Sequence, residues 1–205
     1  MQLDPDKMQL RDIYTTMVGL ITPRPIAWVS SLSRGGIANL APYSFFNGVG
    51  ANPPTIMFCP ANQRDGSPKD TLANIQQTKE FVINVVTEPD ADAMNLTAAN
   101  FTPDEDEFVM AGIQKADSIK IAAPRVANAT AAFECQLHSA LEIGSGPAGA
   151  NLVIGEIVCI YVRDDLINSA GDIDTDRLHT IGRMGGTQYA RTRDRFDIAR
   201  PKRPN

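Results

Sequence analysis

The stretch from Pro23 to Phe46, PRPIAWVSSLSRGGIANLAPYSFF, constrains the fold of this chain more than any other. Two apolar segments, 26–31 and 37–41, are joined by Ser-Arg-Gly-Gly, whose glycines tolerate the positive φ angles of tight hairpin turns. Alternate residues of the first segment are mostly apolar on both faces. The pattern predicts a central β-hairpin buried on both sides, whose second strand breaks at Pro42.

Small polar side chains and aromatic rings gather at the end of this hairpin. They are Ser30, Ser31, Asn39 and Ser44, followed by Phe45 and Phe46. Such residues can belong to a plain core hairpin, in which each polar group satisfies its own turn. They also suit a flat ligand with many polar atoms around its rim. The residues alone leave both interpretations open.

Composition restricts the class of protein. A chain of 205 residues, 43% hydrophobic and 21% charged, is typical of a globular domain with one core. A net charge of −5 argues against nucleic acid as a partner. The sequence has no apolar run of about 20 residues for a membrane span and no signal-peptide core at its N-terminus. We therefore expect a cytoplasmic protein that binds neither membrane nor nucleic acid.

Cysteine spacing gives no metal site. Cys59, Cys135 and Cys159 lie in apolar, strand-like runs whose spacing matches no metal-ligand motif. The two histidines, His138 and His179, accompany no plausible nucleophile, so the sequence contains no visible hydrolase triad. We predict no metal site and reduced, buried thiols.

The rest of the chain favours a mainly β fold, an antiparallel barrel of about six strands with peripheral helices. A weak helical pattern in residues 1–22 is expected to pack against the hairpin. Further strands are expected at 55–59, 80–86, 133–141 and 152–162. In the third of these, Glu134 alternates to the outer face. Gly155 interrupts the last, which indicates a bulge or bend.

Three short helices are expected to begin with the same N-terminal sequence pattern. Ser67, Thr87 and Thr102 each stand three residues before an acid, which is the pattern of a capping box. After Ser67 and Thr102, a proline occupies the first helical position, where its missing N–H costs nothing.

The first of these helix starts is a candidate anion site. A helix N-terminus offers unpaired N–H groups and the positive end of the helix dipole. Here Arg64, Lys69 and the hydroxyl of Thr71 accompany it. On spacing alone, a capped surface helix with a solvated lysine is the simpler interpretation.

Together these stretches resemble the flavin reductase-like family, the FMN-binding split barrels that include flavoredoxin. The proline pair, the hydroxyl pair, the turn glycine, Asn39 and the run APYSFF occur in the family's order at closely similar spacing. Lys69-Asp70-Thr71 resembles the family element that holds the FMN phosphate. The resemblance covers roughly residues 10–190. It implies a Greek-key split β-barrel over residues 1–190, a basic tail over 191–205, FMN as cofactor and a homodimer.

The resemblance also implies the residues of the FMN site. Those around the ring and ribityl chain are Ser30, Ser31, Asn39, Leu40, Ala41, Ser44 and Phe45. Those at the phosphate are Arg64, Lys69 and Thr71, and Arg183 and Tyr189 are expected to reach the pocket from the C-terminal region. No catalytic residue is assigned, because the flavin itself carries the hydride and electron chemistry.

The implied function is an oxidoreductase that passes reducing equivalents from NAD(P)H to flavin. Two alternatives stay open: a fixed-FMN electron-transfer protein that accepts electrons from a donor protein, in the manner of flavoredoxin, and a non-catalytic flavin carrier. Many family members carry a histidine before the G-E/R-V motif of the long strand, where this chain has Ala150 and Asn151. Its absence leaves FMN binding untouched but predicts slow direct turnover with NAD(P)H.

Overall fold

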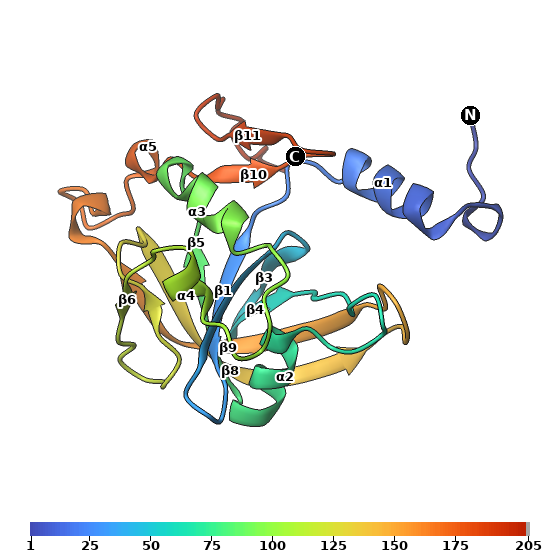
Figure 1. Ribbon diagram of the computed structural model, residues 1–205. Coiled ribbons are helices and arrows are strands. Elements are labelled where there is room, and N and C mark those ends of the chain that lie inside the picture. The colour runs from blue at the N-terminus through green and yellow to red at the C-terminus, as the bar shows by residue number, and fades with distance from the viewer. Residues whose placement is uncertain (204–205) are drawn as a thin grey trace.

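The computed structural model describes residues 1–203. Its centre is a curved antiparallel sheet of seven strands in the order β2-β1-β5-β8-β9-β4-β3 (Figure 1). These strands are β1 (Ala27–Leu32), β2 (Ala38–Tyr43), β3 (Phe46–Ala51), β4 (Pro54–Phe58), β5 (Glu80–Val85), β8 (Ala131–Glu142) and β9 (Asn151–Val162). Two small hairpins lie beside it, β6 (Lys115–Ala116) with β7 (Arg125–Val126), and β10 (Ile181–Arg183) with β11 (Tyr189–Arg191). The expected mainly β fold is confirmed, with one strand more than predicted in the main sheet.

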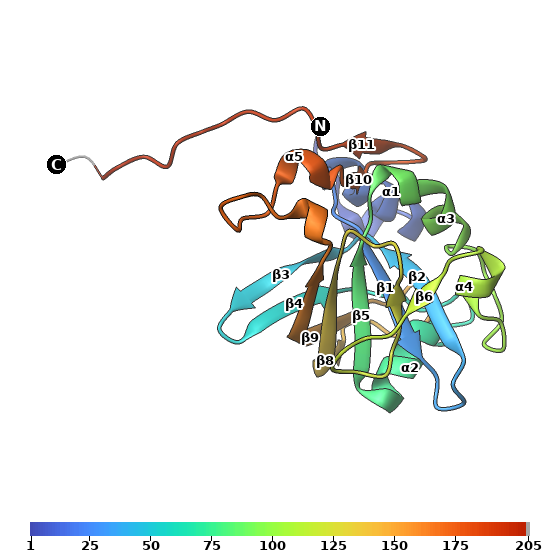
Figure 2. The same cartoon turned by 90° about the vertical axis from the view of Figure 1, so that its left-hand side faces the viewer.

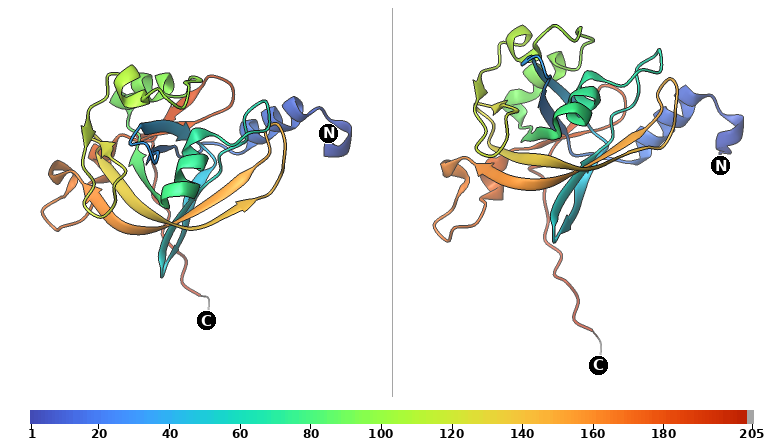
Figure 3. Two further views of the ribbon diagram at one scale, coloured as in Figure 1. Left: turned by 60° about the horizontal axis from the view of Figure 1, so that its bottom comes forward. Right: turned by 90° about the horizontal axis from the view of Figure 1, so that it is seen from below.

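Short helices surround the sheet. The α-helices are α1 (Leu10–Leu20), α2 (Asp70–Thr78), α3 (Ala91–Leu96), α4 (Glu107–Met110) and α5 (Thr175–Leu178), and the 3-10 turns are Pro5–Lys7, Glu88–Asp90 and Asp164–Leu166. Figure 3 shows α2 between the β1–β2 hairpin and the long β8–β9 ribbon. Among the described residues, no helix has the length and apolarity that a membrane crossing requires.

Strand β1 is buried on both faces, as its sequence predicts. Ala27 and Val29 pack on the inner side of the sheet, in one apolar cluster with Leu72 of α2. Trp28 faces the other way, in a second cluster with Met94 of α3, and its indole N–H donates to Thr97 at 2.9 Å. The two-sided burial makes β1 the strand on which both halves of the core are built.

Strand β2 corrects the sequence-based expectation, because it does not break at Pro42. Pro42 pairs with Trp28, and the strand continues to Tyr43. The reason is that β2 is the edge strand of the sheet. The backbone N–H of Leu40 points away from β1 and is bonded outside the sheet, so a proline two residues further on removes no ladder hydrogen bond.

The long β8–β9 ribbon carries the predicted irregularity. The register shifts opposite Gly155, where His138 is the extra residue on β8. Glu134 corrects the predicted alternation, since it is 1% exposed rather than outward in solvent. Its carboxylate accepts hydrogen bonds from the backbone N–H groups of Ile119 (2.8 Å) and Lys120 (2.7 Å), so the segment before β7 covers the outer face of β8.

Helix α1 forms as predicted but does not pack against the β1–β2 hairpin. It projects from the body, and the side chains of Leu10, Tyr14 and Leu20 are 61%, 55% and 79% exposed (Figure 1). Its C-terminal end is fastened by the buried guanidinium of Arg24, which donates to the carbonyl oxygens of Val18 and Ile21, both at 2.7 Å.

Two of the three predicted helix starts are wrong. Helix α2 begins at Asp70, and the Ser67 hydroxyl donates to Asp65 instead of capping the helix. Thr102 donates to the Glu105 carboxylate from its backbone N–H (2.7 Å) and from its hydroxyl (3.0 Å), so its hydroxyl does not cap a helix. These bonds close a turn, and α4 begins later with Asp106 as its N-cap. The capping box at Thr87 is confirmed.

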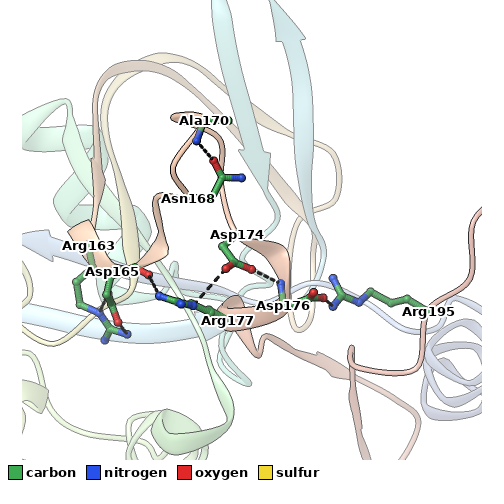
Figure 4. Close-up of polar contacts among 8 residues, drawn as sticks. All are labelled: Arg163, Asp165, Asn168, Ala170, Asp174, Asp176, Arg177 and Arg195. Carbon is green, nitrogen blue, oxygen red and sulfur yellow. Dashed lines mark hydrogen bonds and ion pairs between the residues drawn. The ribbon is translucent and has the colours of Figure 1, made fainter.

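The C-terminal segment leaves the body after a set of ion pairs. Arg191 and Arg193 pair with Glu88, and Arg195 pairs with Asp176 of α5 (Figure 4). Beyond them the chain runs outward (Figure 2). Exposed ion pairs of this kind contribute little to the stability of the folded chain. They influence the path of the C-terminal segment without fixing it firmly to the body. The last two residues of the predicted tail lie outside the described residues.

The close approach at Gly155 gives a first prediction. A Cβ atom there would lie 2.4 Å from Cζ of Phe81 and 3.0 Å from Cβ of Cys135. Gly155→Ala should therefore lower the free energy of unfolding by about 1–3 kcal/mol in urea melts. The loss should shrink in a Phe81→Leu background, since the ring it meets is gone.

Gly19→Ala is the matched control, because nothing lies within 4 Å of its Cβ position in α1. That change should be neutral or stabilising by about 1 kcal/mol. Equal losses at Gly155 and Gly19 would contradict the packing account.

Candidate functional site

A continuous cleft runs along the free edge of β2. Its middle stretch is lined by Asn39, Ala41, Tyr43, Thr71, Asp70, Phe101 and Glu107. One end, the aromatic end, is lined by Tyr14, Ser44, Met94, Arg183 and Tyr189, and the other, the cationic end, by Asn62, Gln63, Arg64, Asp65 and Lys69. Pro42, Tyr43 and Ala98 line both the middle and the aromatic end; Gln63, Lys69 and Asn100 line both the middle and the cationic end.

The middle is the smallest of the three compartments of this cleft. Its volume is about 110 Å³, against about 260 Å³ at the aromatic end and 400 Å³ at the cationic end. One wall is β2, where Asn39, Ala41 and Tyr43 share a face because strand side chains alternate. The opposite wall is the segment from α3 to α4. The cleft therefore consists of three adjoining compartments, of which the middle one has the smallest volume.

The aromatic end is assembled from distant parts of the chain by Arg24. Besides α1, its guanidinium donates to Ser44 Oγ at 3.2 Å and to the carbonyl of Met184 at 3.1 Å. Burial lowers the pKa of Arg24, and its hydrogen bonds to carbonyl oxygens satisfy the charged form. Arg183 lies 4.5 Å from the ring centre of Tyr189, in a cation–π contact.

The middle is built on buried polar side chains. Asn39 donates from Nδ2 to Glu107 at 2.5 Å and accepts at Oδ1 from the hydroxyl of Thr71, also at 2.5 Å. Tyr43 donates to Thr71 at 2.9 Å, and the second carboxylate oxygen of Glu107 accepts from the N–H of Leu40 at 3.1 Å. These hydrogen-bond partners satisfy the polar side chains of this group of residues, whose burial would otherwise be unfavourable.

Two carboxyl groups give the middle an acceptor character. Burial raises the pKa of Glu107, and hydrogen bonds from its own backbone N–H, from the N–H of Leu40 and from Asn39 oppose that effect. Burial likewise raises the pKa of Asp70, which Lys69 opposes. A negative ligand group is therefore disfavoured in the middle, whereas hydroxyl donors are favoured there.

The cationic end has the opposite character. Within residues 1–203, neither Arg64 nor Lys69 has a carboxylate oxygen within 4.0 Å, so their charges are available. Lys69 is the N-cap residue of α2, and no side chain caps that helix. The first-turn N–H groups of α2 therefore add to the positive field beside Lys69.

The structure brings eight of the predicted FMN-site residues to this cleft. They are Asn39, Ala41, Ser44, Arg64, Lys69, Thr71, Arg183 and Tyr189. Thr71 is 1% exposed, and its only proton is donated to Asn39. It therefore supports the wall of the cleft and has no proton left to offer a phosphate while that bond exists.

Four predicted residues do not line the cleft. Ser30 is fully buried and donates to the carbonyl of Pro124 at 2.5 Å, and Ser31 is buried beside Asn39. Leu40 is a core residue, and the ring of Phe45 lies 6.0 Å from the guanidinium of Arg24. Ser31 bonds within its own hairpin, as the simple core-hairpin interpretation expects, whereas Ser30 bonds the distant carbonyl of Pro124, which that interpretation does not describe.

Sequence reasoning missed Glu107, Tyr43 and Tyr14. Tyr43 could have been found, because it shares a strand face with Asn39 and Ala41 inside the motif APYSFF. Glu107 stands in an acidic run, DEDEF, that indicates a helix start and nothing more. Its role depends on contact with a strand 68 residues earlier in the chain.

Asn151 is one of the two residues, with Ala150, that the family resemblance places where a histidine is expected, and its side chain has a structural role. Asn151 is 7% exposed and donates to the carbonyl of Pro60 at 3.2 Å and to Asn62 Oδ1 at 2.8 Å. It holds the loop that forms the cationic end of the cleft.

The fold and the cleft define a class, the split β-barrels of flavin reductases. A family model described as "Flavin reductase like domain" matches residues 18–179. The chain therefore belongs to the flavin reductase-like family, as its motifs predict, and it is a flavin-related oxidoreductase.

Similar proteins match this chain, in sequence or in structure, over nearly its whole length. An uncharacterized protein of Halalkalibacterium halodurans is 36% identical over 203 residues, 98% of this chain and 97% of that protein. The crystal structure of nitrilotriacetate monooxygenase component B from Bacillus cereus has a TM-score of 0.91 at 34% identity, covering 97% of this chain and 98% of that one. That of 2-nitrobenzoate 2-nitroreductase from Pseudomonas fluorescens has a TM-score of 0.88 at 33% identity, covering 98% and 96%.

The raised pKa of Glu107 predicts a pH dependence of stability. Below the ordinary glutamate value of 4.5 its carboxyl is protonated in folded and unfolded chains alike. At higher pH, ionisation favours the unfolded chain, where the pKa is lower. The free energy of unfolding of the wild type minus that of Glu107→Gln should therefore fall as the pH rises above the ordinary value of 4.5, and level off once Glu107 has ionised in the folded chain as well.

Urea unfolding at constant ionic strength measures this difference. Asp70 is present in both proteins, and because its charge raises the pKa of Glu107, the measured difference includes the repulsion between these two carboxyl groups. A difference that is flat or rises with pH would show that the buried carboxyl is stabilised, not strained, in its charged form.

Proposed function

We propose that this protein binds FMN in the cleft and passes reducing equivalents from NAD(P)H to the flavin. The observation that carries the proposal is the order of chemistry along the cleft. An aromatic end, an acceptor-rich middle and a cationic end follow one another. FMN has the same order of parts: an aromatic ring, a polyol chain and a phosphate.

The residues of each compartment fit the part assigned to it. Tyr14 and Tyr189 would flank the ring, with Arg183 beside it. The acceptors Glu107 and Asp70 suit polyol hydroxyls and would repel the phosphate, which directs it to the far end. When bound, FMN supplies the hydride and electron chemistry, and the protein binds, orients and shields it.

At the cationic end, Arg64, Lys69 and the uncapped start of α2 would hold the phosphate. Charge-assisted hydrogen bonds from a lysine or arginine to a phosphate are stronger than neutral ones. The two similar structures are named as a monooxygenase component and a nitroreductase, which supports an oxidoreductase of small molecules.

Titration with FMN, followed by flavin fluorescence, tests the proposal. The wild type should bind with a dissociation constant in the micromolar range or tighter, about −8 kcal/mol or better. Lys69→Ala should weaken FMN by about 10- to 150-fold, because it removes a charge-assisted contact worth roughly 1.5–3 kcal/mol. Riboflavin, which lacks the phosphate, should bind both proteins almost equally.

Arg34→Ala is the matched control, since it removes one exposed charge from the β1–β2 turn, away from the cleft lining. It should leave both affinities unchanged. If the wild type binds no flavin, the proposal fails. If Lys69→Ala weakens FMN and riboflavin equally, Lys69 supports the fold and does not recognise the phosphate.

A second candidate function keeps FMN as a fixed prosthetic group reduced by a donor protein. In its favour is the stretch Ala150-Asn151, where the family resemblance implies a histidine that assists nicotinamide and where Asn151 instead bonds Pro60 and Asn62. Retention of yellow FMN through a desalting column, together with slow anaerobic reduction by NADH and NADPH, would favour it. Release of reduced flavin would favour the reductase.

We also propose a homodimer. Helix α1 exposes Leu10, Tyr14, Met17 and Leu20 on a projecting element, which is unusual for a monomer. Tyr14 also lines the aromatic end of the cleft, so a partner on α1 would lie beside the ring. Two-fold pairs are the commonest soluble oligomers.

Light scattering at micromolar concentration should give about twice the chain mass of 22.2 kDa. Met17→Glu, on the apolar face of α1, should shift the protein toward monomer, whereas Thr15→Glu, on the opposite face, should not. A wild-type mass of one chain with FMN bound would overturn the dimer.

A further inference from the structure

Three hydrogen bonds in the middle of the cleft form a chain in which each residue donates to the next, toward Glu107. The hydroxyl of Tyr43 donates to Thr71, the hydroxyl of Thr71 donates to Asn39 Oδ1, and Asn39 Nδ2 donates to Glu107. All four side chains line the same stretch of the cleft. None of these residues follows another in sequence, and they come from β2, α2 and α4.

Glu107 sets that direction. An ionised carboxylate accepts hydrogen bonds and cannot donate them. One of its oxygens accepts the backbone N–H of Leu40, which cannot turn, and the other faces Asn39. Asn39 must therefore present its NH₂ group to Glu107 and its oxygen to Thr71.

The remaining steps follow from the number of protons. Thr71 has one hydroxyl proton, and Asn39 Oδ1 receives it. Tyr43 must then donate its own proton to Thr71, because Thr71 has only lone pairs left to offer. Within residues 1–203, no group donates a hydrogen bond to the Tyr43 oxygen, and Tyr43 lines both the middle and the aromatic end.

We propose that Glu107 is a positioning residue that fixes Tyr43 as a hydrogen-bond acceptor facing the cleft, and that Tyr43 accepts from a hydroxyl of the ligand's polyol chain. The second part rests on the proposed binding of FMN. The place of Tyr43, between the ring compartment and the acceptor-rich middle, is where the first hydroxyls of such a chain would lie.

A single substitution should reverse the direction. In Glu107→Gln, the one side-chain oxygen must accept the N–H of Leu40, so an NH₂ group faces Asn39. Asn39 then turns its oxygen toward Gln and its NH₂ toward Thr71. The proton of Thr71 is left with Tyr43 as its polar neighbour, and Tyr43 becomes an acceptor from Thr71, with its own proton directed to the cleft.

Raman spectroscopy of the ligand-free protein tests this reversal. The intensity ratio of the tyrosine Fermi doublet rises when a phenol changes from donor to acceptor within its hydrogen bond, and subtraction of the Tyr43→Phe spectrum isolates Tyr43. We expect a donor signature in the wild type, an acceptor signature in Glu107→Gln, and no change in the control Glu156→Gln, an exposed glutamate on β9. A donor signature that persists in folded Glu107→Gln would overturn the role of Glu107.

Ligand affinities test the second part. Tyr43→Phe should weaken FMN and riboflavin alike, by about 2- to 12-fold for one lost hydrogen bond, and leave lumiflavin, which has no polyol chain, unchanged. Equal losses for all three ligands, or no loss, would overturn the contact with the polyol. If the wild type binds no FMN, the proposed function fails and this contact fails with it, while the Raman result still decides the role of Glu107.

Discussion

The cleft depends on the unpaired edge of β2. An edge strand has backbone N–H and C=O groups on its free side, and burying them without partners is costly. Here Pro42 removes one N–H, and the carboxylate of Glu107 accepts the N–H of Leu40. The segment that carries Glu107 must therefore lie across the edge of the sheet, and the space left between that segment and β2 is the middle of the cleft.

The carboxylate of Glu107 adds negative charge to the middle of the cleft, which Asp70 also lines. It is tolerated because Asn39 and Leu40 donate hydrogen bonds to Glu107. The same charge gives the cleft a polarity, since Arg64 and Lys69 lie at one end only. This charge distribution favours one orientation of a ligand that carries a single anionic group.

The aromatic end rests on another buried charged group. Arg24 collects carbonyl oxygens from the end of α1 and from the loop after β10, and it also holds Ser44 at the end of β2. One guanidinium, with five donors in a fixed plane, can join three segments that a neutral side chain could not. Tyr14, Arg183 and Tyr189 reach the cleft because those segments are tied together.

The sequence by itself determined the mainly β class, the two-sided burial of β1 and the placement of Lys69 and Arg64 beside a helix start, since alternation, turn glycines and helix signals are local properties. It could not tell that Ser30 and Ser31 point into a covered core while Tyr43 lines a cleft, because alternation assigns a side chain to a face and does not say what covers that face. The role of Glu107 was decided by tertiary structure alone, since a carboxylate acquires its partners only when α4 lies against a strand 68 residues earlier.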